Sequence, residues 1–260
     1  MAEWEIVELG MTRAEVRRRA DGTAYAKTAR DPATRRELRD ERDRLLWLAG
    51  TGLADEGLAT PGVLDWVETD EAATLVTRTV PGIPASDVSR DQVPATVASL
   101  ARALRTLHDL PVDTCPFDHR LAVTCARART AVETDDVDED DFDAERRGRT
   151  AVDLLAELEA TRPAAEAAEP HDLVVSHGDA CLPNLLVDPS TLRPTGLVDL
   201  GRLGVADRHL DLALLRRSIT TPDLNEQYGA ADAAALVAAY GLARADEGRL
   251  AFYRLLDEFF

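Results

Sequence analysis

The stretch VVSHGDACLPN, residues 174–184, decides how the chain is interpreted, because an apolar run ends there in a short polar loop. The run begins at Leu173, and the loop then presents His177, Asp179 and Asn184. The end of a strand holds side chains rigidly while the following loop exposes them, and many enzymes keep catalytic groups in such a loop. The stretch therefore predicts an active-site loop after a buried strand.

The sequence after this loop predicts a hairpin. Residues 185–187 and 196–198 form its strands, and the turn-like DPSTLRPT lies between them. The return strand would bring Asp199 back beside Asn184. Magnesium is usually held by one or two such oxygen groups and by substrate phosphates, so both residues are candidate ligands. Asp179 is then left to orient a substrate hydroxyl and accept its proton in phosphoryl transfer.

The chain contains one lysine, Lys27, among 30 basic residues, which suggests that an ammonium group is needed at this position. Alternation in TAYAKT, residues 23–28, predicts a strand with Tyr25 and Lys27 on one face. The stretch RRELRDERDRLLWLAG, residues 35–50, predicts a helix with Glu41 on its apolar stripe. A carboxylate on an apolar face is costly without a cation, so a Lys27–Glu41 ion pair is predicted. The alternative is a glutamate at the edge of the stripe that reaches water.

The remaining patterns divide the chain into two lobes. Residues 72–80 predict a further strand, and PGIP, residues 81–84, interrupts the pattern. Apolar spacing over residues 94–110 predicts a long amphipathic helix, and helical sequence continues to about Ala168. We therefore expect a nucleotide-binding N-terminal lobe, 1–80, and a catalytic and substrate-binding C-terminal lobe, 81–260.

Composition limits the class of protein. The chain has 260 residues, 45% of them apolar, which is enough for a large core, and a net charge of -18. That charge disfavours nucleic acid as a partner and favours a cationic one. The three cysteines have no Cys-x-x-Cys spacing, and no apolar run is long enough to span a membrane. We expect a cytoplasmic protein that is a monomer or a weak dimer.

Taken together, the motifs follow the plan of a protein-kinase-type site. A strand lysine paired with a helix glutamate precedes Asp179-x-x-x-x-Asn184, and the tripeptide Asp199-Leu200-Gly201 supplies an Asp-x-Gly motif. Each element alone is weak evidence, but their order and spacing together are specific. His177-Gly178 stands where protein kinases have His-Arg, which points to kinases of small molecules.

The chain also resembles a known family through the segments VVSHGDACLPN, GLVDLGRLGVADRHLDLAL, CPFDHRL and LAFYRLLDEFF. These resemble the aminoglycoside 3'-phosphotransferases, antibiotic-resistance kinases with a bilobal, protein-kinase-like α+β fold. The resemblance implies a small N-terminal lobe with an antiparallel sheet and a larger, mainly helical C-terminal lobe. It also implies ATP and Mg²⁺ as cofactors and transfer of the γ-phosphoryl group to the 3'-hydroxyl of an aminoglycoside.

The resemblance further implies roles for individual residues. The acidic run at 133–145, which alone is typical of a solvated helix face, would bind the ammonium groups of the antibiotic. Simple packing of Phe259 and Phe260 is the alternative for the tail. The implied sites are catalytic Asp179 and Arg202; nucleotide-side Lys27, Glu41, Tyr25, Thr12, Thr77 and Thr79; magnesium ligands Asn184 and Asp199; and substrate-side Asp140, Asp141, Asp143, Arg202, Asp257, Glu258 and Phe260.

Three other functions are compatible with parts of the pattern. A kinase for another position, such as the 3''-hydroxyl of streptomycin, shares much of the C-terminal sequence, although the ending LLDEFF favours the 3' class. A nucleotide-binding pseudokinase fits the irregular phosphate loop at residues 10–15, and a divalent-metal hydrolase could use the same carboxylates. The hydrolase would have little use for the lysine–glutamate pair. The sequence does not determine which aminoglycosides are accepted or whether GTP replaces ATP.

Overall fold

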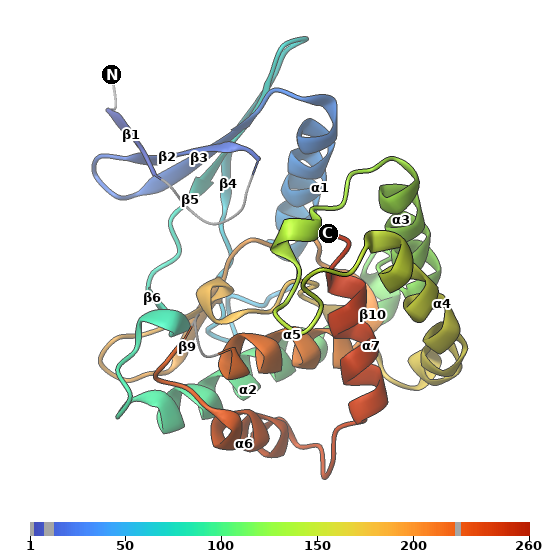
Figure 1. Cartoon of the computed structure of the whole chain (residues 1–260). Coiled ribbons are helices and arrows are strands. Elements are labelled where there is room, and N and C mark those ends of the chain that lie inside the picture. Colours follow the sequence, from blue (N-terminus) through green and yellow to red (C-terminus); the bar gives the residue numbers. More distant parts are fainter. Residues whose placement is uncertain (1–2, 8–12, 222–224) are drawn as a thin grey trace. The chain divides into compact units, whose positions relative to one another are not determined.

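The computed structural model describes residues 3–7, 13–221 and 225–260 (Figure 1). These residues form two compact units. The first contains the described residues up to Val88 together with 183–202, and the second contains 89–182 and 203–260. The predicted hairpin after the polar loop thus belongs with the N-terminal unit. The functional division into lobes 1–80 and 81–260 stays a prediction.

The first unit is built on an antiparallel sheet with the strand order β1-β2-β3-β5-β4. A second, smaller sheet has the order β6-β8-β9, and one long helix, α1, contacts β3 and β5 of the larger sheet. The elements are β1 Trp4–Ile6, β2 Glu15–Arg19, β3 Ala24–Ala29, α1 Pro32–Leu48, β4 Val63–Glu68, β5 Ala73–Arg78, β6 Ile83–Pro84, β8 Leu185–Val187 and β9 Pro194–Leu197.

Strand β3 lies in the middle of the larger sheet, between β2 and β5. Its alanines Ala24 and Ala26 are buried, while Tyr25 and Lys27 are half-buried on the other face. Lys27 lies opposite Val16 on one side and Leu75 on the other. The predicted alternation is therefore confirmed, and a central strand holds the backbone of Lys27 through ladders on both edges.

Helix α1 begins earlier than the predicted stretch because of its N-terminal cap. The Asp31 side chain accepts hydrogen bonds from the Ala33 and Thr34 amides, and Pro32 occupies the first turn, where its missing N–H is not needed. Glu41 is buried on the same stripe as Leu38 and Leu45. The prediction of a carboxylate inside an apolar stripe is confirmed.

The smaller sheet contains the hairpin predicted after the polar loop. Strands β8 and β9 pair antiparallel, with Leu185 opposite Leu197. Residues Ala59 and Gly196 form a parallel bridge, and a Cβ atom at Gly196 would collide with the Val80 side chain and the Ala59 carbonyl oxygen. Glycine at 196 therefore allows the close approach that fixes the return strand.

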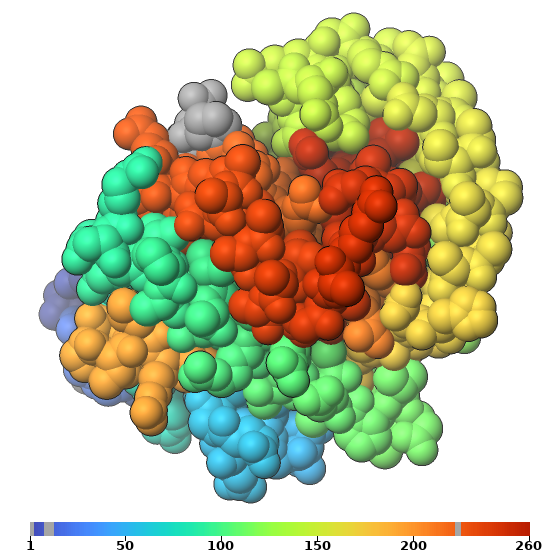
Figure 2. Space-filling model, turned by 90° about the horizontal axis from the view of Figure 1, so that it is seen from below, coloured from blue at the N-terminus to red at the C-terminus, as the bar shows by residue number. Residues whose placement is uncertain are grey.

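The second unit is mainly helical, with one short antiparallel pair, β7 and β10. Helix α2 packs against α6, and α5 packs against α7; Figure 2 shows α6, in orange-red, beside the green α2. The elements are α2 Val93–His108, α3 Leu121–Glu133, α4 Ala151–Ala168, β7 Leu173–Ser176, β10 Gly204–Asp207, α5 His209–Thr220, α6 Ala230–Tyr240 and α7 Glu247–Asp257. Short 3₁₀ turns occur in both units and not in the second unit alone: η1 Ala85–Asp87, η2 Val112–Thr114, η3 Glu139–Asp141, η4 Glu169–His171 and η5 Leu182–Asn184.

The cores of both units are mainly aliphatic, and that of the second unit also contains aromatic residues such as Phe252 and Tyr253. The predicted α2 helix supplies Val97, Leu100, Leu104 and Leu107 to this second core. None of the three cysteines, which all lie among the described residues, forms a disulfide. Among the described residues, none of the helices combines the length and apolar character needed to cross a membrane.

Candidate active site

Lys27 forms the centre of an ion-pair cluster in the first unit. Its Nζ atom donates to both carboxylate oxygens of Glu41, at 2.8 and 3.0 Å, and to Oδ1 of Asp199 at 2.9 Å. The Lys27–Glu41 pair predicted from the apolar stripe is confirmed. The contact with Asp199 shows that the hairpin carries its carboxylate back to the same ammonium group.

Burial and charge act against each other in this cluster. Burial would lower the pKa of Lys27, but the carboxylates of Glu41 and Asp199 outweigh it and raise the pKa above its usual value, so the ammonium stays charged. Burial raises the pKa of Glu41, and the attraction of Lys27 only partly opposes that rise. Glu41 therefore depends on Lys27 to remain ionised inside the unit.

The backbone at Asp199 is held in an uncommon conformation. Its φ angle is 58°, in the left-handed region that residues other than glycine rarely adopt. The Val198 amide donates a hydrogen bond to the Asn184 carbonyl oxygen at 3.0 Å. This bond fixes the backbone immediately before Asp199. Strained backbone persists where the surroundings determine it, often at functional sites. The hairpin thus brings the backbone of Asn184 next to that of Val198, and carboxylate and amide oxygens such as those of Asp199 and Asn184 are the ligands that suit a hard cation such as Mg²⁺.

The loop that carries Asp179 is anchored on a buried carboxylate in the second unit. Oδ1 of Asp211 accepts hydrogen bonds from the Ser176 hydroxyl at 2.8 Å and the Gly178 amide at 2.9 Å. Its Oδ2 accepts one from the His177 amide at 2.7 Å. Gly178 has a φ of 81°, which favours glycine at this turn. The loop is therefore shaped by α5 immediately before the catalytic candidate.

A histidine completes the anchor from another helix. Nε2 of His108 lies 2.8 Å from Oδ2 of Asp211, and Nδ1 of His108 lies 2.7 Å from the Tyr240 hydroxyl. Burial alone would raise the pKa of Asp211, yet the hydrogen bonds and charge from His108 and the His177 amide lower it. Asp211 therefore stays ionised, and its donors make it a support for the loop.

His177 is fully buried, and its Nδ1 accepts a hydrogen bond from the Asp179 amide at 3.3 Å. His177 thus braces the turn that carries Asp179. Asp207 accepts a hydrogen bond from the amide of His209, the first residue of α5, at 2.9 Å, and so holds the start of that helix.

The acidic segment and the tail are linked by arginines in the second unit. Arg217 donates to Asp257 at 2.7 Å and lies 3.7 Å from Asp143. Arg254 donates to Asp143 at 3.2 Å and to Glu145 at 3.0 Å. The structure thus brings predicted substrate residues from the segment and from α7 into one network, in which arginine is the common partner.

Asp140 and Asp141 are exposed in the 3₁₀ turn Glu139–Asp141. Burial, and then the charges of Asp138, Asp143 and Asp257, raise the pKa of Asp141 against the opposing effect of Arg217. Residues 139–141 therefore do not belong to a solvated helix face, the alternative for this run. They form a turn that concentrates negative charge next to the end of α7.

The other predicted residues are placed as follows. Tyr25 on β3 lies opposite Thr77 on β5. The Thr79 hydroxyl donates a hydrogen bond to the Gly22 carbonyl oxygen at 2.7 Å. Thr79 therefore holds the turn between β2 and β3 in place. Arg202 is half-buried and Phe260 is exposed. Thr12 lies outside the described residues, and the meeting of Asp179 with Asn184 and Asp199 stays a prediction.

Sequence reasoning missed Arg217 as the partner of Asp257, and it missed Ser176 and His108 as partners of Asp211. No local spacing pattern indicates the partners of Arg217, because these partners lie 40 and 74 residues away in the chain. His108 ends the apolar stripe of α2 and could have been noticed as a histidine next to buried leucines. The acceptor that it meets lies 103 residues further along the chain, which no local pattern indicates.

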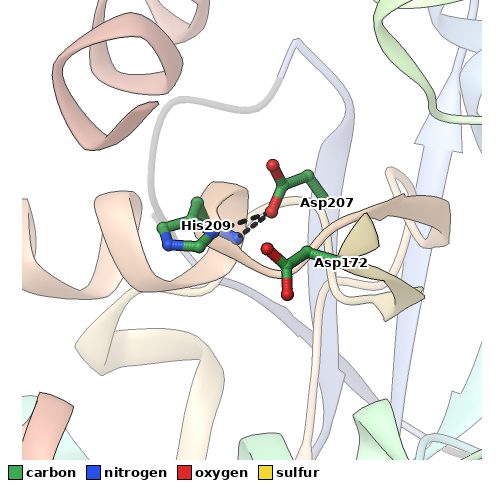
Figure 3. A group of neighbouring side chains, drawn as sticks. All are labelled: Asp172, Asp207 and His209. Atoms are coloured by element: carbon green, nitrogen blue, oxygen red, sulfur yellow. Dashed lines mark hydrogen bonds and ion pairs between the residues drawn. The ribbon is translucent and has the colours of Figure 1, made fainter. Parts of the chain in front are cut away.

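A second group of titratable residues, Asp172, Asp207 and His209, has ligand atoms close enough to hold a metal (Figure 3). However, Arg249 donates to Asp172 at 2.7 Å and to Asp207 at 2.9 Å, and His209 Nδ1 lies 2.8 Å from Asp207. The guanidinium already neutralises the oxygens that a cation would need. We assign this group to the packing of α5 and α7 against β7 and β10.

A lysine paired with a helix glutamate, an adjoining Asp-x-Gly hairpin and an anchored Asp-x-x-x-x-Asn loop define a kinase-like phosphotransferase. The model of the phosphotransferase enzyme family matches residues 3–253, and the chain belongs to this family. The resemblance stated from the sequence is thus confirmed, as is its fold class.

Three relatives illustrate the match. An aminoglycoside 3'-phosphotransferase of Streptomyces fradiae is 44% identical over 99% of this chain and 95% of its own length. A streptomycin 3''-kinase of Streptomyces griseus is 41% identical over 98% of this chain and 91% of its own length. The structure of the aminoglycoside phosphotransferase APH(3'')-Id from Streptomyces rimosus with ADP and streptomycin is 37% identical, with a TM-score of 0.85 over 99% of this chain and 92% of that chain.

Proposed function

We propose that the chain transfers the γ-phosphoryl group of ATP to the 3'-hydroxyl of an aminoglycoside of the kanamycin or neomycin class, which inactivates the antibiotic. The observation that carries the proposal is the contact of the single lysine, Lys27, with both Glu41 and Asp199. A lysine held in this way can bind phosphate oxygens, and a hydrolase that needed only carboxylates would not require it. The ADP named in the Streptomyces rimosus complex supports ATP as the donor.

The roles of the residues follow from their chemistry. Asp179 would orient the 3'-hydroxyl and accept its proton, while a bond forms between the 3'-oxygen and the γ-phosphorus and the bond to the ADP oxygen breaks. Lys27 would bind the phosphates of the nucleotide. Asn184 and Asp199 would hold Mg²⁺, which supplies charge neutralisation at the phosphates when bound. Arg202 would contact the substrate side of the same loop.

Tyr25, Thr77 and Thr79 would receive the adenine base in the first unit, and Thr12 would lie over the phosphates. The ammonium groups of the antibiotic would meet the carboxylates of Asp140, Asp141, Asp143 and Asp257, and the antibiotic would also contact Phe260. A polycation gains energy among several carboxylates, since opposite charges attract over several ångströms. The negative charge gathered around Asp141 supports this assignment.

The proposal is tested by measuring ADP release with ATP, Mg²⁺ and kanamycin or neomycin. We expect release that depends on the antibiotic, and roughly 1–100 turnovers per second. The matched control is Asp179→Ala, which should still bind ATP but lose about 10²–10⁴-fold in transfer. A folded wild-type protein that releases no antibiotic-dependent ADP would contradict the proposal, as would an Asp179→Ala variant with full turnover. ADP released without any acceptor would indicate the hydrolase instead.

A second candidate is a kinase for the 3''-hydroxyl of streptomycin, which the printed names of the Streptomyces griseus and Streptomyces rimosus relatives favour. The ending LLDEFF, residues 255–260, still favours the 3' class for this chain. NMR of the phosphorylated product distinguishes the two positions. We expect phosphate on the 3'-oxygen of kanamycin and little turnover of streptomycin, and the reverse pattern would favour the second candidate.

A further inference from the structure

We propose that Ser218, near the end of α5, is a positioning residue for phosphoryl transfer. Its hydroxyl oxygen holds the part of the active-site loop that follows Asp179, as the carboxylate of Asp211 holds the part that precedes it. The effect on turnover rests on the proposed function, in which Asp179 orients the acceptor hydroxyl. The anchor itself rests on contacts within the second unit.

The contact joins α5 to the loop in the interior of this unit. Oγ of Ser218 accepts a hydrogen bond from the Leu182 amide at 3.1 Å. Leu182 is fully buried, and Ser218 is 5% exposed. Leu182 is the first residue of the turn η5, and the first amides of such a turn have no acceptor within it. The Ser218 oxygen therefore satisfies a buried donor that the turn itself cannot satisfy.

Ser218 and Asp211 approach the loop from one face of the same helix. They are seven residues apart, which is about two turns of an α-helix, so both side chains lie on the same side of α5. Asp211 accepts hydrogen bonds from the amides of residues 177 and 178. Ser218 accepts one from Leu182. One helix face thus holds the loop at two separate points.

Asp179 lies in the short stretch between these two points, residues 179–181. Ala180, in the middle of the stretch, is fully buried. Fixing the backbone at both ends of so short a stretch leaves it few conformations. The backbone that carries the Asp179 carboxylate is therefore determined by α5 on both sides.

The hydroxyl of Ser218 differs from its neighbours on α5. The hydroxyl groups of Thr220 and Thr221 donate to carbonyl oxygens four residues earlier, each at 2.8 Å. This local bond is common for hydroxyl residues in a helix. The Ser218 oxygen instead accepts from an amide 36 residues earlier in the chain. The contact therefore serves the loop and not the helix that carries it.

The backbone of Ser218 is itself held in place. Ser218 lies two residues before the end of α5, where carbonyl groups lack partners within the helix and the helix can fray. Nδ2 of Asn225 donates to the Ser218 carbonyl oxygen at 2.9 Å, and Asn225 is buried at 5% exposure. Asn225 thus gives the anchor a fixed position at the end of the helix.

Loss of the Ser218 hydroxyl should act on the chemical step. The Leu182 amide would be left buried and unpaired, so the loop would have to move to satisfy it. A displacement of about 1 Å at the reacting groups can cost roughly 10²-fold in rate. The groups proposed to bind the nucleotide and the antibiotic lie mainly on other segments, such as Lys27 on β3 and Asp141 in η3. Substrate binding should therefore change less than turnover.

The experiment measures kcat and the KM values for ATP and kanamycin in Ser218→Ala and Ser218→Thr. We expect Ser218→Ala to lower kcat about tenfold to a hundredfold, while both KM values stay within about twofold of wild type. Ser218→Thr keeps a hydroxyl oxygen at this position and should retain most of kcat.

Two control variants separate the anchor from other effects. Thr220→Ala removes an exposed hydroxyl from the same helix and should leave kcat unchanged. Leu158→Val trims a fully buried side chain of α4, which packs on α3 and α7, and it should lower the Tm without lowering kcat. Wild-type kcat in Ser218→Ala would overturn the proposal. Equal losses of kcat in Ser218→Ala and in either Ser218→Thr or Leu158→Val would overturn it as well.

Exchange of the Leu182 amide proton, measured by NMR, needs no turnover and so distinguishes a failure of the anchor from a failure of the proposed function. We expect this amide to exchange about tenfold faster in Ser218→Ala than in wild type, Ser218→Thr or Thr220→Ala. Faster exchange in Ser218→Ala, with no antibiotic phosphorylation by the wild type, would support the anchor and contradict the proposed function. Unchanged exchange of Leu182 would overturn the anchor whatever the activity.

Discussion

At the scale of single residues, the ionic state of Glu41 depends on one ammonium group. Glu41 is buried in the stripe of α1, and its pKa is raised by burial and by the charge of Asp199 despite the nearby Lys27. The single lysine of the chain thus stabilises the first unit, and in the proposed function it also provides a cation for phosphates. A substitution at Lys27 should therefore affect stability and transfer together.

We predict that Lys27→Met lowers the free energy of unfolding by about 1–3 kcal/mol at neutral pH, because it leaves the buried Glu41 carboxyl without its partner, either charged or forced to take up a proton. Without the lysine, the pKa of Glu41 in the folded state rises further above its unfolded value. A carboxyl with a raised folded pKa favours folding below that pKa, so the loss should shrink as the pH falls towards 5 and grow above neutrality. Urea unfolding at several pH values measures this dependence.

The control for this prediction is the double variant Lys27→Met with Glu41→Gln. It removes the buried charge and should recover much of the stability while phosphoryl transfer stays low. A Lys27→Met variant with the same loss of stability at pH 5 and pH 8 would contradict the account of Glu41.

At the scale of elements, the active-site loop is shaped by helices that carry no catalytic candidate. Helix α5 supplies Asp211, and α2 supplies His108, which also meets Tyr240 of α6. Asp211 receives four hydrogen bonds from two side chains and two amides. The position of Asp179 is thus set by a buried acceptor, which lies 32 residues after it in the sequence.

We predict that Asp211→Asn destabilises the protein by about 2–4 kcal/mol and lowers kcat strongly. The asparagine keeps the volume, but its NH₂ group would face two of the four donors. Thermal or urea unfolding and antibiotic-dependent ADP release measure the two effects. The exposed residue Asp113 provides the control Asp113→Asn, which should change neither quantity. Wild-type stability of Asp211→Asn would contradict the proposed anchor.

Local patterns predicted the elements that carry the ion pair, because periodicity acts over a few residues. The alternation around Lys27 and the stripe around Glu41 indicated both sides of the pair. The earlier start of α1 at the Asp31 cap and the strands β1, β2, β4 and β6 were not predicted. Long-range partners could not be predicted in this way. Arg146 meets Glu258 across 112 residues, and no periodicity connects them.

At the scale of the whole molecule, the net charge is a property that follows directly from the sequence. The net charge of -18 favours encounters with a polycationic substrate and opposes those with anions. Salt screens the attraction between the exposed charges of the protein and the substrate, whereas it screens buried ion pairs much less. Charge should therefore affect substrate capture more than the chemical step.

We predict that KM for kanamycin rises several-fold between about 50 and 500 mM monovalent salt, while kcat changes little. The KM for ATP, an anion, should not rise in parallel, and it provides the internal control. Steady-state kinetics at several salt concentrations measure both values. A KM for kanamycin that is independent of salt would contradict the assigned role of the acidic residues.

The central claim is transfer to the 3'-hydroxyl, and a matched pair of substrates tests it most directly. Antibiotic-dependent ADP release is measured with an aminoglycoside and with its 3'-deoxy analogue, which keeps the ammonium groups but lacks the acceptor oxygen. The account predicts turnover of the parent compound, and binding without turnover for the analogue. Equal turnover of both compounds would contradict it.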